Sequence, residues 1–122
     1  MSELADLEVI AVDDVWVACL SGEIDLSNAE AIATAIEPVF ERQGKGLVID
    51  LTAVEYLDSA GIRLIFRMVR SSESRGWRLR LVVPAQSHLR RVLDLADVAR
   101  AVQLEETRAG AVTDIKAASD EP

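Results

Sequence analysis

The spacing of hydrophobic residues changes abruptly near the middle of the chain. Residues 47–51 are apolar except for Asp50, a pattern typical of a short strand buried on both faces. Between this run and the next amphipathic segment, residues 58–61 (DSAG) form a small polar turn that we expect to cap a helix. After this turn the apolar residues follow the spacing of one helical face, at Ile62, Ile65, Phe66 and Val69.

The remaining apolar runs predict further strands and helices on either side of this central unit. A strand over 7–12 and a second over 15–20 flank the turn signal Asp13-Asp14, which favours a hairpin. Later strands are expected over 77–83 and 102–104, the last at a sheet edge. Ser87 and Thr107 are the candidate starts of a third and a fourth helix.

The first helix is expected to follow a capping box, in which Ser27 is the cap and Glu30 lies three residues later. Its apolar face would run from Ala29 to Phe40. Pro38 lies near its end and should kink or shorten the helix, because proline cannot donate to the carbonyl four residues back.

The predicted order β-β-α-β-α-β-α-β-α indicates an α/β fold, with a mixed, mostly parallel sheet of about five strands and about four helices. The length of 122 residues suits one domain spanning 1–122, since it allows one core and is too short for two. We expect the core over residues 7–107 and loose termini at 1–6 and 119–122.

The formal net charge of −8 is unevenly distributed. Residues 1–60 hold 13 acidic and two basic residues, whereas residues 61–122 hold eight acidic and 11 basic ones. A polarised surface of this kind can steer a protein partner, or it can simply reflect differently solvated faces. The acidic total argues against non-specific nucleic-acid binding.

The usual catalytic and cofactor motifs are missing from the sequence. His88 is the only histidine, no Gly-x-Ser-x-Gly elbow surrounds Ser59, and no Walker A or Gly-x-Gly-x-x-Gly loop occurs. The single Cys19 lies in an apolar run, which favours a small buried side chain over a metal ligand. We therefore expect no enzyme, no cofactor and no metal, and, without a leader or membrane-length apolar run, a cytoplasmic protein.

Two segments together resemble the signatures of the STAS domain family. Residues 48–62 (VIDLTAVEYLDSAGI) are similar to its motif of a buried strand followed by Asp-Ser-Ser/Ala-Gly and a helix. Residues 20–29 (LSGEIDLSNA) resemble its second signature, in which a Gly and an Asp follow the second strand. The resemblance covers about residues 7–107 and is nearest to the stand-alone bacterial anti-sigma factor antagonists.

The resemblance implies a phosphorylation switch at Ser59. Unphosphorylated, such a protein binds an anti-sigma factor that is also a serine kinase, and so releases a sigma factor. Phosphorylation of Ser59 then ends the binding, and a serine phosphatase reverses it. The predicted helix N-terminus at Ser59 is a place that tolerates a phosphate. On this basis Asp25 and Asp58, if both turns lie at one sheet end, would form an acidic rim around it.

Several residues near this turn allow more than one interpretation. Ser59 could be only a helix cap and Asp25 only a loop residue. Gly61 would let a partner's backbone approach closely. Arg63, Arg67 and Arg70 share one helical face that is either solvated or partner-binding. Two further interface candidates, expected to be exposed on the same helix, are Leu64 and Met68.

Two other functions stay open from the sequence. One is a structural STAS subunit, in a stressosome-like scaffold or on a lipid transporter. The other is a small nucleotide-binding or hydrolytic protein. The serine retained in the DSAG turn favours the switching interpretation over a purely structural role.

Overall fold

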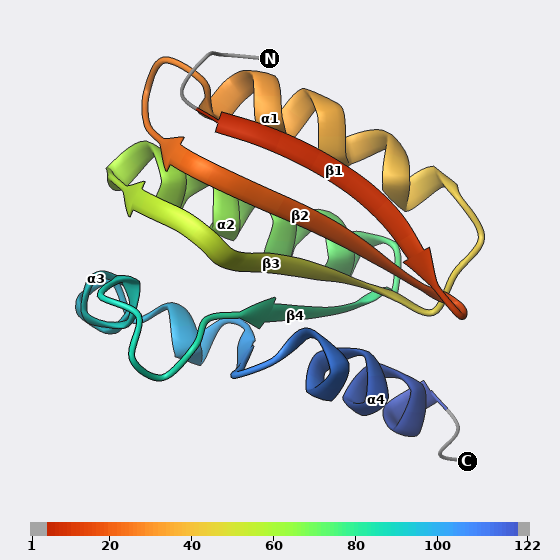
Figure 1. The fold of residues 1–122 in the computed structure, drawn as a ribbon. Helices are drawn as coiled ribbons and strands as arrows, with labels where there is room; N and C mark the ends of the chain where they lie inside the picture. Colours follow the sequence, from red (N-terminus) through yellow and green to blue (C-terminus); the bar gives the residue numbers. More distant parts are fainter. Residues whose placement is uncertain (1–4, 120–122) are drawn as a thin grey trace.

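Five strands lie side by side in the order in which they occur in the chain (Figure 1). The computed structural model describes residues 5–119. An antiparallel hairpin comes first, and every later strand is parallel to its neighbour. The strands are β1 (Ala5–Val12), β2 (Val15–Ile24), β3 (Gly46–Leu57), β4 (Arg78–Val82) and β5 (Gln103–Glu105).

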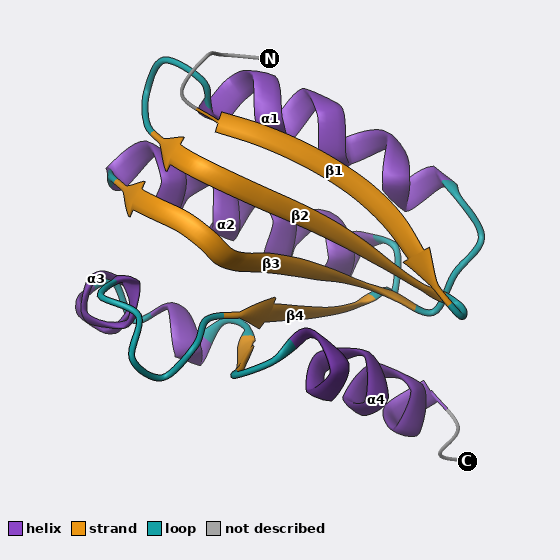
Figure 2. Ribbon diagram, viewed as in Figure 1, coloured by secondary structure: helices purple, strands orange, loops and turns teal. Residues whose placement is uncertain are grey.

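Helices cover both faces of the sheet (Figure 2). The expected element order is confirmed, with two short 3₁₀ helices in addition. Four α-helices connect or follow the strands: α1 (Ala29–Ile36), α2 (Ser59–Ser74), α3 (Leu89–Leu95) and α4 (Arg108–Ser119). The 3₁₀ helices are η1 (Glu37–Glu41) and η2 (Val98–Arg100).

Strand β3 is the centre of the molecule. Over Gly46–Asp50 it pairs with β2 on one side and β4 on the other, which explains why residues 46–51 are all buried. The strand continues beyond the apolar run to Leu57, paired only with β2, and only Val54 and Leu57 of these later residues are buried. Two register shifts in the β2–β3 ladder accompany this change.

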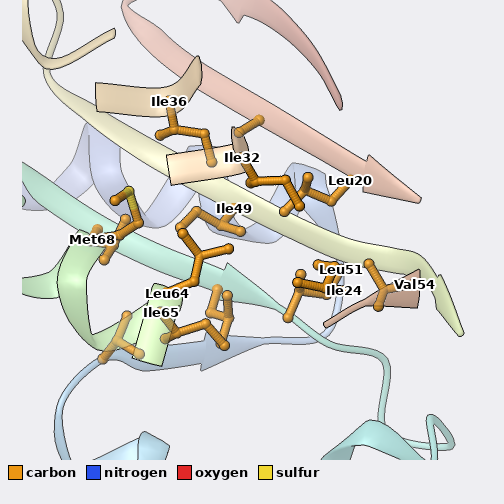
Figure 3. Packing of buried hydrophobic residues seen from close by; sticks show 14 of the residues in the cluster. Leu20, Ile24, Ile32, Ile36, Ile49, Leu51, Val54, Leu64, Ile65 and Met68 are labelled. Atoms are coloured by element: carbon orange, nitrogen blue, oxygen red, sulfur yellow. The ribbon is translucent and has the colours of Figure 1, made fainter. Parts of the chain in front are cut away.

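Two hydrophobic clusters fill the two faces of the sheet. The larger cluster lies between the sheet and α1, α2 and α3 (Figure 3). It includes Ile32 and Ile36 of α1 and Ile65 and Met68 of α2. The smaller cluster lies under α4 and is formed by Val15, Val17, Val48, Val82, Ala111, Val112 and Ile115. Helix α4 is therefore packed on its own side of the sheet, away from α1 and α2.

The expected capping box at the start of α1 is wrong. The cap residue is Asn28, not Ser27, and its side chain does not cap the helix. Instead the Asn28 side chain accepts a hydrogen bond from Asp25 N at 3.0 Å and donates to Glu23 O at 2.8 Å. Asn28, only 1% exposed, thus fastens the loop that leaves β2.

The remaining expectations about local structure are largely confirmed. Helix α1 ends at Ile36, and Pro38 lies at the start of η1, where a missing N–H costs little. Trp77 packs edge-on against Phe40, and the guanidinium of Arg42 lies over Trp16, so both tryptophans serve packing. The expected loose termini lie mainly outside the described residues, but β1 already begins at Ala5, which is 3% exposed.

Candidate functional site

The ends of β2 and β3 meet at one edge of the sheet. Ile24 pairs with Leu57, and the next residue, Asp58, donates its backbone N–H to Ile24 O at 3.2 Å. Asp25 and Asp58 therefore begin the two loops that leave neighbouring parallel strands. The condition for an acidic rim, that both turns lie at the same end of the sheet, is therefore met. Loops at the carboxyl ends of parallel strands are common binding sites in α/β proteins.

Asp58, rather than Ser59, caps α2. Its Oδ1 accepts hydrogen bonds from Ala60 N at 2.8 Å and Gly61 N at 3.3 Å. Ser59 is the first residue of the helix and is exposed, and its hydroxyl forms no hydrogen bond with any other residue in the described range 5–119. The cap interpretation of Ser59 is therefore wrong, and its hydroxyl is available for chemistry.

Asp25 has a structural task of its own. Its Oδ1 accepts hydrogen bonds from the backbone N–H of Ser27 at 2.9 Å and from the Ser27 hydroxyl at 2.5 Å. Its backbone N–H is bound by Asn28. Asp25 therefore stabilises the β2–α1 loop, as the loop interpretation predicts, and it also places a negative charge at the same edge as Ser59.

Gly61 does not serve the approach of a partner. The residue is buried, and a Cβ added to it would lie 2.7 Å from Leu57 Cγ and 3.4 Å from Ile24 Cγ2. The close approach that glycine allows is internal, because the first turn of α2 packs on the ends of β2 and β3. The expected role of Gly61 at the surface is corrected accordingly.

An open hollow of about 290 Å³ lies between α1 and α2, beside Ser59. The three arginines on the predicted face of α2 all line it. Arg67 is engaged, since its guanidinium lies 3.1 Å from Glu30 and 3.4 Å from Glu37. Arg63 and Arg70 are exposed and have no ion pair with any residue in the described part of the chain.

The expected exposure of Leu64 and Met68 is wrong. Leu64 is 6% exposed and Met68 is fully buried, and both belong to the larger hydrophobic cluster. Leu64 reaches the surface only where it lines the hollow between α1 and α2. Both residues lie on the buried face of α2, whereas Arg63 and Arg70 lie on its exposed face.

Two exposed apolar residues at this edge were missed from the sequence. Leu26 follows Asp25 and is 77% exposed, and Tyr56 near the end of β3 is 49% exposed. The sequence held a signal for the exposure of Leu26, because it is a large apolar residue in a loop between the polar residues Asp25 and Ser27. Tyr56 lies beyond the apolar run 47–51, and no expectation for its exposure came from the sequence. We call the residues Asp25, Leu26, Tyr56, Asp58, Ser59 and Arg63 the Ser59 surface.

The described residues offer little for other chemistry. Among residues 5–119 there is no group of three His, Cys, Asp or Glu side chains that could hold a metal ion. A ring nitrogen of His88 is within hydrogen-bond distance of the Glu55 carbonyl oxygen, so the histidine is engaged away from Ser59. None of the helices in this range has the length and apolar character needed to cross a membrane.

The structure is thus a small α/β domain with an exposed serine at the first position of α2. The family model for the STAS domain matches residues 6–111. The chain belongs to the STAS domain family. This confirms the resemblance seen in the two sequence signatures.

Several similar proteins carry names with a regulatory meaning. The anti-sigma-F factor antagonist RsfB of Mycobacterium tuberculosis is 34% identical over 119 residues, covering 95% of both chains. The crystal structure of an anti-sigma factor antagonist from Mycobacterium paratuberculosis has 31% identity and a TM-score of 0.74, covering 92% of this chain and 94% of that one. A structure from Thermotoga maritima, called a putative anti-sigma factor antagonist, has a TM-score of 0.81 at 24% identity, covering 90% and 94%, and supports the fold.

Proposed function

We propose that this protein is an anti-sigma factor antagonist, switched by phosphorylation of Ser59. The observation that carries the proposal is the exposed Ser59 at the first position of α2, whose hydroxyl has no hydrogen-bond partner among residues 5–119, while Asp58 supplies the cap. Similar proteins support the proposal. RsfB and the Mycobacterium paratuberculosis protein are both called anti-sigma factor antagonists, and both match nearly the whole chain at more than 30% identity.

In the unphosphorylated state the Ser59 surface binds an anti-sigma factor and so frees a sigma factor. Leu26 and Tyr56 supply the apolar contact area, which suits an interface since a few large side chains dominate binding energy. Asp25 and Asp58 place carboxylates beside these two residues and favour a partner with basic groups. The sigma factor itself makes no contact with this chain in the proposal.

The anti-sigma factor is also the kinase in this proposal. The Ser59 Oγ attacks the γ-phosphorus of ATP bound to the partner, ADP leaves, and the serine proton passes to a base of the kinase. ATP and Mg²⁺ belong to the partner, and a serine phosphatase restores the hydroxyl by hydrolysis. The protein is thus a substrate and not an enzyme, and it acts in the cytoplasm.

Phosphorylation adds about −1.5 to −2 charges at neutral pH to a surface that already holds two carboxylates. Ser59 is exposed and its hydroxyl forms no hydrogen bond within residues 5–119, so we expect the fold to remain intact while the charge of the surface changes. The partner surface that accepted Asp25 and Asp58 then meets a bulky anion in place of a small hydroxyl. Release follows from a changed surface rather than from unfolding.

The experiment is a binding measurement with the anti-sigma factors of the same genome, using wild type, Ser59→Ala and protein phosphorylated at Ser59. One partner should bind wild type and Ser59→Ala alike, and phosphorylation should weaken it at least about tenfold, or 1.4 kcal/mol. Equal affinity of the phosphorylated and unphosphorylated forms would contradict the switch. Isolation only in large assemblies, or together with a membrane ATPase, would favour a structural subunit instead.

A further inference from the structure

Among the described residues, Arg63 differs from its neighbour Arg67 in having no ion-pair partner. Arg67 is held by Glu30 and Glu37 of the α1 segment, whereas Arg63 is exposed and forms no ion pair within residues 5–119. The guanidinium of Arg63 is therefore available to bind an added anion, such as a phosphate. The geometry of α2 determines which anion it can reach.

Ser59 and Arg63 are four residues apart on one continuous helix. Side chains at i and i+4 lie one above the other, about 5–6 Å apart at Cβ. Helical side chains also lean toward the N-terminus of their helix, so the long Arg63 side chain extends over the position of Ser59. Arg63 is the first cationic residue of α2, and Arg67 is a further turn away.

We propose that Arg63 binds the phosphate of phosphorylated Ser59 across the first turn of α2. The inference rests on the proposed function, which supplies the phosphate. A guanidinium offers paired N–H donors that match phosphate oxygens, and the pair adds to the stabilisation of an anion at a helix N-terminus. Asp58 does not compete for Arg63, since no ion pair joins the two within residues 5–119 and Asp58 Oδ1 accepts from Ala60 N and Gly61 N.

The contact gives phosphorylation a second effect on the Ser59 surface. Before phosphorylation, Arg63 lines the hollow beside Leu26 and can meet a carboxylate of the partner. After phosphorylation, the same guanidinium is drawn to the phosphate. The modification therefore adds an anion and withdraws a cation from the partner at the same time.

The test uses the full chain with phosphoserine incorporated at position 59 during synthesis, so that no kinase is needed. Phosphorus NMR follows the second ionisation of the phosphate against pH in wild type, R63Q and R70Q. R63Q should raise the phosphate pKa by about 0.2–0.4 pH unit, the size expected for one i, i+4 ion pair. R70Q is the matched control, since Arg70 lies about 16 Å from Ser59 along the helix axis and its loss should leave the phosphate pKa unchanged.

An equal phosphate pKa in wild type and R63Q would overturn the inference. R63K keeps the positive charge, so its phosphate pKa should lie close to that of wild type. A phosphate pKa in R63K as high as in R63Q would also count against an ion pair. The titration needs no partner, so it decides the Arg63 contact independently of the antagonist function. With a partner available, phosphorylation should weaken binding by a smaller factor in R63Q than in wild type, and an equal factor would count against the withdrawal of Arg63.

Discussion

Arg108 Nε lies 2.9 Å from Asp50 Oδ2 and joins the first residue of α4 to the centre of β3. The Asp50 side chain is 6% exposed, whereas that of Arg108 is 43% exposed. The other carboxylate oxygen accepts hydrogen bonds from the backbone and hydroxyl of Thr52 at 2.9 and 2.6 Å. A buried charge in the most central strand is thus compensated by a residue from the last helix. The neighbouring carboxylate also raises the pKa of Arg108.

Arg108→Met should lower the free energy of unfolding by about 1–3 kcal/mol, because it leaves the buried Asp50 carboxylate with only its Thr52 hydrogen bonds. The loss is smaller than for a fully buried pair, since Arg108 is partly solvated. Urea denaturation measures it, with Arg91→Met on the exposed side of α3 as control. In an Asp50→Asn background the same change should cost less, and an undiminished cost would argue against the ion pair.

Asp58→Ala should destabilise the protein by about 1 kcal/mol, whereas Ser59→Ala should change stability by less than about 0.5 kcal/mol. The reason is that Asp58 accepts the two free N–H groups of the first turn of α2, while Ser59 accepts none. Thermal and urea unfolding of the two variants, measured together, check the assignment of the cap. A larger loss for Ser59→Ala would return Ser59 to the capping role.

Gly61→Ala should cost about 1–3 kcal/mol, since the new Cβ would overlap Leu57 and push α2 away from the sheet. The loss should be partly relieved by Leu57→Ala, which removes the overlapping Cγ and Cδ1 atoms. A double-mutant cycle by urea denaturation therefore gives less than the sum of the two single losses. Strict additivity of the two changes would be evidence against this packing.

Leu26→Ser should weaken binding of the anti-sigma factor about tenfold or more while leaving the unfolding free energy within about 0.5 kcal/mol of wild type. Leu95→Ser is a matched control, because Leu95 is 78% exposed, nearly the same as Leu26 at 77%, and lies in α3 outside the Ser59 surface. Calorimetric titration measures affinity and urea denaturation measures stability. Equal affinities for the two variants would remove Leu26 from the interface.

The Cys19 thiol should titrate above the usual range of cysteine. Burial raises the pKa of Cys19, and the charges of Asp50 and Glu8 raise it further, while Arg108 opposes them. The pH midpoint of alkylation should therefore lie above that of the urea-unfolded chain, and Arg108→Met should move it higher. Because the folded pKa is the raised one, the thiol's contribution to stability is present at neutral pH and declines as pH rises through that pKa. A midpoint equal to that of the unfolded chain would contradict the burial effect.

The element order and the site edge could be predicted because they depend on local periodicity. The switch from an apolar run to helical spacing around residues 58–61 located the start of α2, whereas β3 extends to Leu57, beyond the apolar run that predicted it. The charged and apolar faces of α2 set Arg63 outward and Ile65 inward. The juxtaposition of Asp25 and Asp58 followed from the parallel pairing of β2 and β3.

The errors came from tertiary contacts that spacing alone does not encode. Ser27 fits a capping box, but Asn28 takes its place as the cap residue because its amide fastens Glu23 and Asp25. Gly61 was predicted to lie at the surface, but the side chain of Leu57 fills the space beside it. The Asp50–Arg108 pair joins residues 58 positions apart, a distance that no local pattern spans.

The sheet order follows the chain order, and this has a consequence for how the protein is made. Each strand can join a sheet edge that is already present, so no strand has to insert between two earlier ones. All residues of the Ser59 surface lie between positions 25 and 63, and α2 ends at Ser74. A domain generally folds as one unit, and Ile65 of α2 packs in one cluster with Leu81 of β4 and Leu89 of α3. The surface for the partner is therefore complete only when the C-terminal strands and helices have been made and have joined the sheet.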